Sequence, residues 1–226
     1  MSSDDALKYQ EGAPPRPEEI PVGVIISPDT RRENRIPPGQ SRTRKWPVLD
    51  AFGPPKIPAD AKLEVCGLVE RPLAFTLAEF AQLPRVKVFA DFHCVTHWSR
   101  LGNIWEGVSA RELLQRAGIK PAARFVVLHG HDHGWTTNLP LDHFLADDAL
   151  VADLHDGLPL TSEHGGPLRA IVPQLYAWKS AKWLKGIELV AEDQAGYWEQ
   201  GGYHMRGDPW VTNQKNPTGE RFRDDW

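Results

Sequence analysis

Residues 91–100 read DFHCVTHWSR, and this stretch carries the features that decide the fold of the chain. It follows a β-rich run at residues 86–92, so Cys94 leaves a strand and enters a polar loop. Two histidines and an arginine lie within six residues of the thiol. Cationic neighbours lower the pKa of a cysteine and favour the thiolate, which binds metals or attacks electrophiles. The residues alone fit this interpretation and that of a buried, inert cysteine equally well.

Further apolar runs surround this stretch, with short helices between them. We expect strands at residues 62–69, 125–129, 168–172 and 187–190, and a helical turn at 141–145. A capping box of Thr76 and Glu79 predicts one short helix. A second box, Ser109 with Glu112, predicts a helix that ends at Gly118. Because strands and helices do not alternate regularly, the pattern favours an α+β domain with mixed sheets, short helices and many loops over a Rossmann or barrel fold.

Composition is that of an ordinary globular protein. The 226 residues are 41% hydrophobic and 25% charged, with 20 prolines and 19 glycines that favour many turns. The net charge of −4 argues against nucleic acid as a partner, since such proteins carry a basic patch. We find no apolar run long enough for a membrane span and no signal peptide, so we expect a cytoplasmic protein.

The chain is predicted to have three parts. Residues 1–45 are polar and proline-rich, and we expect an extended segment that wraps the surface or is partly disordered. Residues 46–195 hold the predicted strands and helices and form the domain. Residues 196–226 are rich in tryptophan, tyrosine and glycine without periodicity, and we expect a tail that packs on the domain.

A histidine-rich stretch offers a second site for chemistry. His129-Gly130-His131-Asp132-His133 is similar to zinc motifs of hydrolases but lacks one residue between the second histidine and the aspartate. We therefore expect a polar turn that faces the pocket, with a zinc site as the alternative.

A third site lies at residues 178–183, WKSAKW. Two lysines that flank a serine, with backbone N–H groups, are typical of a phosphate cradle. Arg169 adds a planar donor suited to phosphate. Large apolar neighbours indicate partial burial, and a buried lysine needs an anion.

Taken together, these sites resemble the molybdopterin-binding domain of sulfite oxidases and related bacterial sulfoxide reductases. The similarity is greatest to bacterial sulfite-oxidase-like proteins without a haem domain, and it covers roughly residues 36–210. It is carried by IPPGQ at 36–40, DFHCVTHWS at 91–99, WEGV at 105–108, TTNLPL at 136–141, GGPLR at 165–169, YAWKSAKW at 176–183 and YHMRGDPW at 203–210.

The resemblance implies a molybdenum–pterin cofactor with Cys94 as the protein ligand to the metal. It implies cofactor contacts from His164 and Arg169, and a phosphate site in the segment formed by Lys179, Ser180, Ala181 and Lys182. Arg100, near Cys94, is expected to be a catalytic residue that shapes the pocket. Sulfite oxidases place a tyrosine near the metal where this chain has Asp153, a carboxylate that would disfavour sulfite.

The predicted function is oxygen-atom transfer to or from a small molecule, with an external electron partner. The chain has two cysteines and no Cys-x-x-Cys-His haem motif of its own. Two alternatives stay open, namely a carrier that binds the pterin cofactor without catalysis and a zinc hydrolase that uses residues 129–133.

Overall fold

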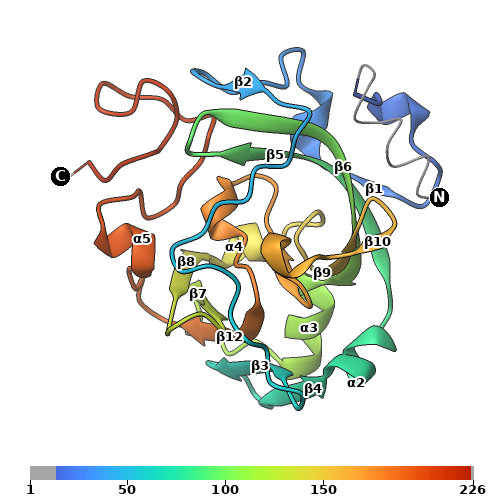
Figure 1. Cartoon of the computed structure of the whole chain (residues 1–226). Helices are drawn as coiled ribbons and strands as arrows, with labels where there is room; N and C mark the ends of the chain where they lie inside the picture. The colour runs from blue at the N-terminus through green and yellow to red at the C-terminus, as the bar shows by residue number, and fades with distance from the viewer. Residues whose placement is uncertain (1–13, 225–226) are drawn as a thin grey trace.

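Two packed β-sheets form the body of the computed structural model, which describes residues 14–224 (Figure 1). The seven-stranded sheet runs in the order β1 (Ile25–Ile26), β5 (Val86–Cys94), β6 (Trp98–Ser109), β9 (Leu150–His155) and β10 (Leu158–Pro159), with β2 (Ser41–Arg42) beside β6 and β11 (Arg169–Ile171) beside β9. The five-stranded sheet runs in the order β4 (Leu73–Thr76), β3 (Lys62–Gly67), β12 (Leu184–Val190), β7 (Phe125–Gly130) and β8 (Thr136–Pro140). The predicted strands and the α+β class are confirmed.

Short helices connect the strands. The α-helices are α2 (Leu77–Ala81), α3 (Ala110–Ala117), α4 (Leu141–Phe144) and α5 (Tyr197–Gln200), and the 3-10 helices are η1 (Pro17–Glu19), η2 (Pro28–Arg31), η3 (Ser162–His164) and η4 (Ala177–Lys179). The capping box before α2 is confirmed, because Thr76 Oγ1 accepts from the backbone N–H of Glu79 and Glu79 Oε2 accepts from that of Thr76. Ser109 precedes α3 without a side-chain cap bond, so the second predicted box is wrong. Gly118 ends α3 at a φ of 74°, a conformation that glycine adopts without strain.

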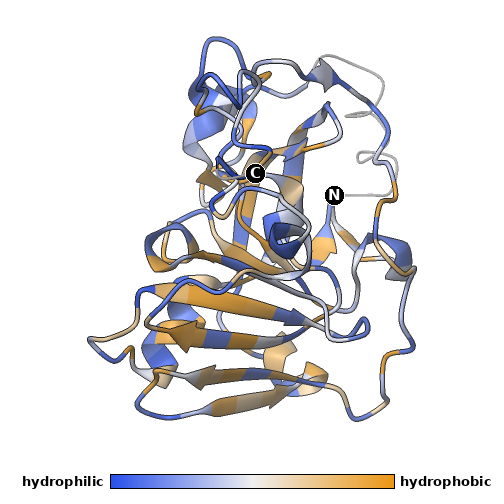
Figure 2. Cartoon of the chain, turned by 90° about the vertical axis from the view of Figure 1, so that its left-hand side faces the viewer, coloured by the Kyte–Doolittle hydropathy of each residue, from blue (hydrophilic) through white to orange (hydrophobic). Residues whose placement is uncertain are grey.

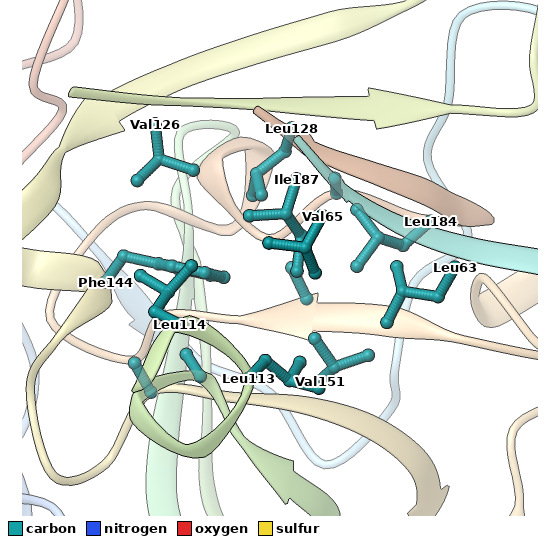
Figure 3. Close-up of a cluster of buried hydrophobic side chains, with 14 of the residues drawn as sticks. Leu63, Val65, Leu113, Leu114, Val126, Leu128, Phe144, Val151, Leu184 and Ile187 are labelled. Atoms are coloured by element: carbon teal, nitrogen blue, oxygen red, sulfur yellow. The ribbon is translucent and has the colours of Figure 1, made fainter. Parts of the chain in front are cut away.

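One-sided burial explains the five-stranded sheet. In β3, exposed Lys62 and Glu64 alternate with fully buried Leu63 and Val65, as the two-residue period of a strand requires. The buried face packs against α3 and the seven-stranded sheet, and Figure 3 shows Leu113, Leu114 and Val151 facing Val65 and Ile187 across this core. In Figure 2 the hydrophobic colouring lies mainly on the strands and the hydrophilic colouring on the loops.

The N-terminal segment contributes to the sheet. The strands β1 and β2 pair in parallel with β5 and β6, so part of the predicted surface segment is structural. Residues 1–13 of that segment and residues 225–226 of the predicted tail lie outside the described residues. Within 14–224 no helix has the length and apolarity needed to cross a membrane.

Candidate active site

A cavity of about 200 Å³ lies where the Cys94 loop, the segment 46–51 and the stretch after β11 meet. Its walls are largely aromatic, formed by Trp46, Phe92, Trp98, Trp135, Trp178, Trp183, Trp198 and Tyr203. Its polar side chains are Asp50, Cys94, Thr96, Asp132, Arg169, Ser180 and Lys182. Half of the predicted site residues, namely Cys94, Arg169, Ser180 and Lys182, therefore meet in one place, although they come from segments far apart in the chain.

Cys94 ends β5 and lines the cavity with a free, buried thiol. Thr96 Oγ1 donates a hydrogen bond to Cys94 Sγ at 3.3 Å. Burial raises the pKa of the thiol, while the Thr96 hydroxyl and the charge of Arg169 lower it by smaller amounts. The prediction that the neighbouring histidines and Arg100 lower this pKa is wrong, because burial outweighs the nearby donors and the thiol is held in its neutral form.

The N-terminal segment fixes the backbone of Cys94. Gln40 Nε2 donates to the Cys94 carbonyl at 3.0 Å, and Gln40 Oε1 accepts from Ser99 Oγ at 2.7 Å. The Ser99 hydroxyl has a single hydrogen, which it donates to Gln40 Oε1. In the hydrogen bond of 2.9 Å between His93 Nδ1 and Ser99 Oγ, His93 is therefore the donor. Burial lowers the pKa of His93 to about 3, so the ring is neutral. His93 therefore supports the Cys94 loop through Ser99.

Arg169 is buried and only partly bonded. Its Nη1 donates to the His164 carbonyl at 2.9 Å, and its guanidinium lies over the ring of Phe92 at 5.0 Å. Its buried Nε has no hydrogen-bond partner among the described residues. Burial lowers the pKa of Arg169 to about 9, because the desolvated guanidinium has too few partners to offset its charge. A cavity wall with a desolvated cation and a spare donor is suited to an anion.

A second charged group stands near the first. Lys182 Nζ donates to the Glu163 carbonyl at 2.8 Å and lies 3.4 Å from Asp50 Oδ2. Burial, followed by the charge of Arg169, lowers the pKa of Lys182 to about 8. Burial raises the pKa of Asp132 to about 6, and its Oδ1 is buried without a partner among the described residues. The cavity thus offers both unmet donors and an unmet acceptor.

His164 lies behind the wall of the cavity and does not line it. Its Nε2 donates to the Trp46 carbonyl at 3.2 Å, and its ring packs on the Trp46 indole with centroids 3.8 Å apart. Its carbonyl holds Arg169. His164 therefore positions Trp46 and Arg169, and a direct contact of its ring with the cofactor stays a prediction.

The segment 179–182 divides between cavity and core. Ser180 lines the cavity, where its Oγ accepts from the Val172 N–H at 3.0 Å, and Lys182 lines it too. Lys179 is fully buried, and its Nζ donates to Glu199, to Asn138 and to the Met205 carbonyl. The prediction that the Lys179 ammonium binds phosphate is wrong, because its hydrogens are spent on protein groups outside the cavity. Ala181 is a core residue, and no side-chain role follows for it.

Arg100 is also absent from the cavity wall. Its Nη2 donates to Asp156 Oδ2 at 2.8 Å, and its Nη1 contacts Asn103 and His155. Both side chains of the Arg100–Asp156 pair are less than a tenth exposed. The predicted catalytic role of Arg100 is therefore wrong, and the pair holds β6 to the end of β9.

Asp153 does not face the cavity, since its carboxylate forms an ion pair with Arg85. The argument that this residue disfavours sulfite is therefore wrong. Asp50 and Asp132 are the carboxylates that line the cavity.

The histidine-rich stretch forms the turn between β7 and β8. His129 Nε2 lies 2.9 Å from Glu188 Oε2, and the ring of His133 contacts Phe52. Within residues 14–224 no group of three or more His, Cys, Asp or Glu side chains could hold a metal ion. The zinc alternative is therefore wrong, and the expectation of a polar turn that faces the pocket is confirmed by Asp132.

Several cavity residues escaped prediction. Trp46 and Asp50 lie in a proline-rich stretch interpreted as loop, and only the aromatic and apolar content of residues 46–52 hints at burial. Tyr203 lies in one of the segments that carry the family resemblance, but nothing local in the sequence indicates that it reaches the Cys94 cavity.

Comparison with known proteins identifies the family of this chain. The family model described as oxidoreductase molybdopterin binding domain matches residues 51–198. The uncharacterized oxidoreductase YuiH of Bacillus subtilis is 49% identical over 181 residues, with 79% of this chain and 91% of YuiH covered. The putative protein-methionine-sulfoxide reductase subunit YedZ1 of Azospira oryzae is 28% identical, with 76% of this chain and 66% of that protein covered.

More distant similarities cover smaller parts of larger proteins. The chain spans 19% of the nitrate reductase [NADH] of Cucurbita maxima, at 28% identity over 66% of this chain. The crystal structure of the sulfane dehydrogenase SoxCD from Paracoccus pantotrophus matches with a TM-score of 0.57 and 24% identity, covering 62% of this chain and 41% of that one, and it supports the fold alone. The chain therefore belongs to the oxidoreductase molybdopterin binding domain family and is a molybdopterin-dependent oxidoreductase of the sulfite-oxidase type.

Proposed function

We propose that the protein transfers an oxygen atom between its molybdenum cofactor and a small uncharged sulfur compound, and that it works as an S-oxide reductase. The charge balance of the cavity carries this proposal. The wall has two cations, Arg169 and Lys182, and two carboxylates, Asp50 and Asp132. An anionic cofactor would take up the cations and leave no free positive charge for an anionic substrate.

The residues present fit the cofactor. The buried Nε of Arg169 lacks a partner among the described residues, and Lys182 lies beside it, so an anionic group would find two cations and a spare donor. Asp132 Oδ1 would accept from an N–H edge of the pterin. Cys94 provides one soft sulfur ligand for the metal. When bound, the molybdenum cofactor would supply a metal centre that takes an oxygen atom from the substrate while giving up two electrons, or does the reverse.

The protein itself contributes by binding the substrate and excluding water. Reduction of a sulfoxide breaks the S=O bond, consumes two protons and two electrons, and yields a thioether and water. The electrons come from an external carrier protein, since this chain has no haem motif. The aromatic side chains exclude water and offer polarizable surfaces, which attract sulfur. Trp98 and Phe92 flank Cys94 and therefore border the reacting position.

Sulfite is the less suitable substrate. A divalent anion would enter a cavity whose cations the cofactor has taken and whose remaining charges are carboxylates. The similarity to YedZ1 supports sulfoxide reduction, because that relative is described as a putative protein-methionine-sulfoxide reductase subunit.

The test uses purified protein with its molybdenum content measured by mass spectrometry. We expect anaerobic oxidation of reduced methyl viologen by methyl phenyl sulfoxide, and little reduction of ferricyanide by sulfite. A variant with Cys94→Ser serves as the inactive control. Turnover of sulfite that exceeds turnover of the sulfoxide by the metal-loaded protein would overturn the proposed direction and substrate class.

A further inference from the structure

Tyr203 lines the active-site cavity, and its hydroxyl is uncommitted. It follows α5 and lines the same cavity as Cys94. Of the other two cavity hydroxyls, that of Thr96 donates to Cys94 Sγ, and that of Ser180 accepts from the Val172 N–H. The described residues provide no hydrogen-bond partner for the Tyr203 hydroxyl. Trp98 Nε1 is also without a partner among the described residues.

The ring of Tyr203 is held in place on three sides. It stacks on Trp198 with centroids 5.3 Å apart, and it packs edge-on against Trp178 at 5.2 Å and Phe222 at 5.9 Å. Its backbone N–H donates to the Trp198 carbonyl at 3.0 Å. A side chain with two rotatable bonds that is clamped in this way loses little entropy when it binds a ligand. The hydroxyl is therefore preorganised.

Electrostatics keep this hydroxyl a donor. Burial raises the pKa of Tyr203. A phenol that stays protonated across the neutral range offers one O–H to an acceptor in the cavity.

We propose that Tyr203 donates a hydrogen bond to the oxygen of a sulfoxide or sulfone held beside Cys94, and so recognises S-oxides over the corresponding thioethers. This inference rests on the proposed function, of which it specifies the substrate recognition. The S=O oxygen is a strong acceptor, and the hydroxyl of the clamped Tyr203 ring has no partner among the described residues. The loss of one such bond in a buried site leaves the acceptor unmatched and weakens binding about tenfold.

The test separates recognition of oxygen from turnover. Binding of methyl phenyl sulfone and of methyl phenyl sulfide to the metal-loaded protein is measured by quenching of tryptophan fluorescence, because the cavity is lined by tryptophans. For Tyr203→Phe we expect binding of the sulfone to weaken about tenfold and binding of the sulfide to stay the same. The matched control is Tyr197→Phe, since Tyr197 is exposed and does not line the cavity.

Equal changes for sulfone and sulfide in Tyr203→Phe, no change for either ligand, or no binding of the sulfone by the wild-type protein would each overturn the assignment of Tyr203. If the wild-type protein fails to reduce methyl phenyl sulfoxide but Tyr203→Phe loses only sulfone binding, the proposed reaction fails and the role of Tyr203 stands. Melting temperatures and molybdenum contents that match the wild type show that the variants are folded and loaded.

Discussion

Lys179 and Glu199 form an ion pair with 2.5 Å between Nζ and Oε1, and neither side chain is exposed. The same carboxylate oxygen accepts from Thr137 Oγ1 and from Trp178 Nε1, both at 2.8 Å. The pair therefore joins η4, β8 and α5 directly behind the aromatic wall of the cavity. Its role is to hold the C-terminal segment, with Trp198 and Tyr203, against the domain.

Loss of one partner of this pair should be costly. Replacement of Lys179 by Met leaves the Glu199 carboxylate buried and uncompensated, and we expect the free energy of unfolding in urea to fall by about 3–5 kcal/mol. The double variant Lys179→Met/Glu199→Gln should recover part of this loss, because the second change removes the unpaired charge. A loss below about 1 kcal/mol in the single variant would show that the pair is not a structural clamp.

Arg169 and Arg100 should respond in opposite ways to the same substitution. Arg169→Met removes a desolvated cation that lacks a full set of partners, so we expect the cofactor-free protein to keep or gain stability while molybdenum content falls at least tenfold. Arg100→Met breaks a buried ion pair and should cost about 3–5 kcal/mol of stability. Mass spectrometry of metal content and urea unfolding check the two expectations. Unchanged molybdenum content in Arg169→Met would remove this residue from the cofactor site.

Cys94→Ser should separate folding from catalysis. The change removes the soft ligand but keeps the volume and the neighbouring bonds, and we expect a melting temperature within a few degrees of the wild type. Turnover of the sulfoxide should be abolished. The matched control variant is Cys66→Ser, because Cys66 lies on β3 and does not line the cavity. Full turnover by the Cys94 variant would contradict its assignment as metal ligand.

The raised pKa of Asp132 predicts that the stability of the cofactor-free protein depends on pH. Burial raises its pKa to about 6, so the folded state binds a proton more tightly than the unfolded state does. This stabilisation is fully present below the unfolded pKa near 3.8 and is lost as the pH rises through about 6. The wild type should therefore lose about 1 kcal/mol more than Asp132→Asn between pH 5 and pH 7. Parallel pH profiles of the two proteins in urea unfolding would contradict the prediction.

Patterns local in the chain determined much of the secondary structure and pointed to Cys94 as the candidate metal ligand. Period-two burial in β3 and the capping box at Thr76 depend on neighbours a few residues away, so the sequence displays them directly. The family resemblance around Cys94 could be recognised from the sequence for the same reason, because the residues of the motif are contiguous.

Tertiary structure alone decided which charged and polar groups face the cavity. Lys179 and Lys182 are three residues apart and look alike in the sequence, yet one ammonium is spent on Glu199 in the core and the other lines the cavity. Arg100 and Asp153 were assigned by proximity to Cys94 or by alignment, but each finds an ion-pair partner at least 50 residues away. Asp50, Asp132 and Tyr203 reach the cavity from three separate segments. The free energy of a charge depends on its burial and its partners, and both are set by contacts between distant segments, which no local pattern records.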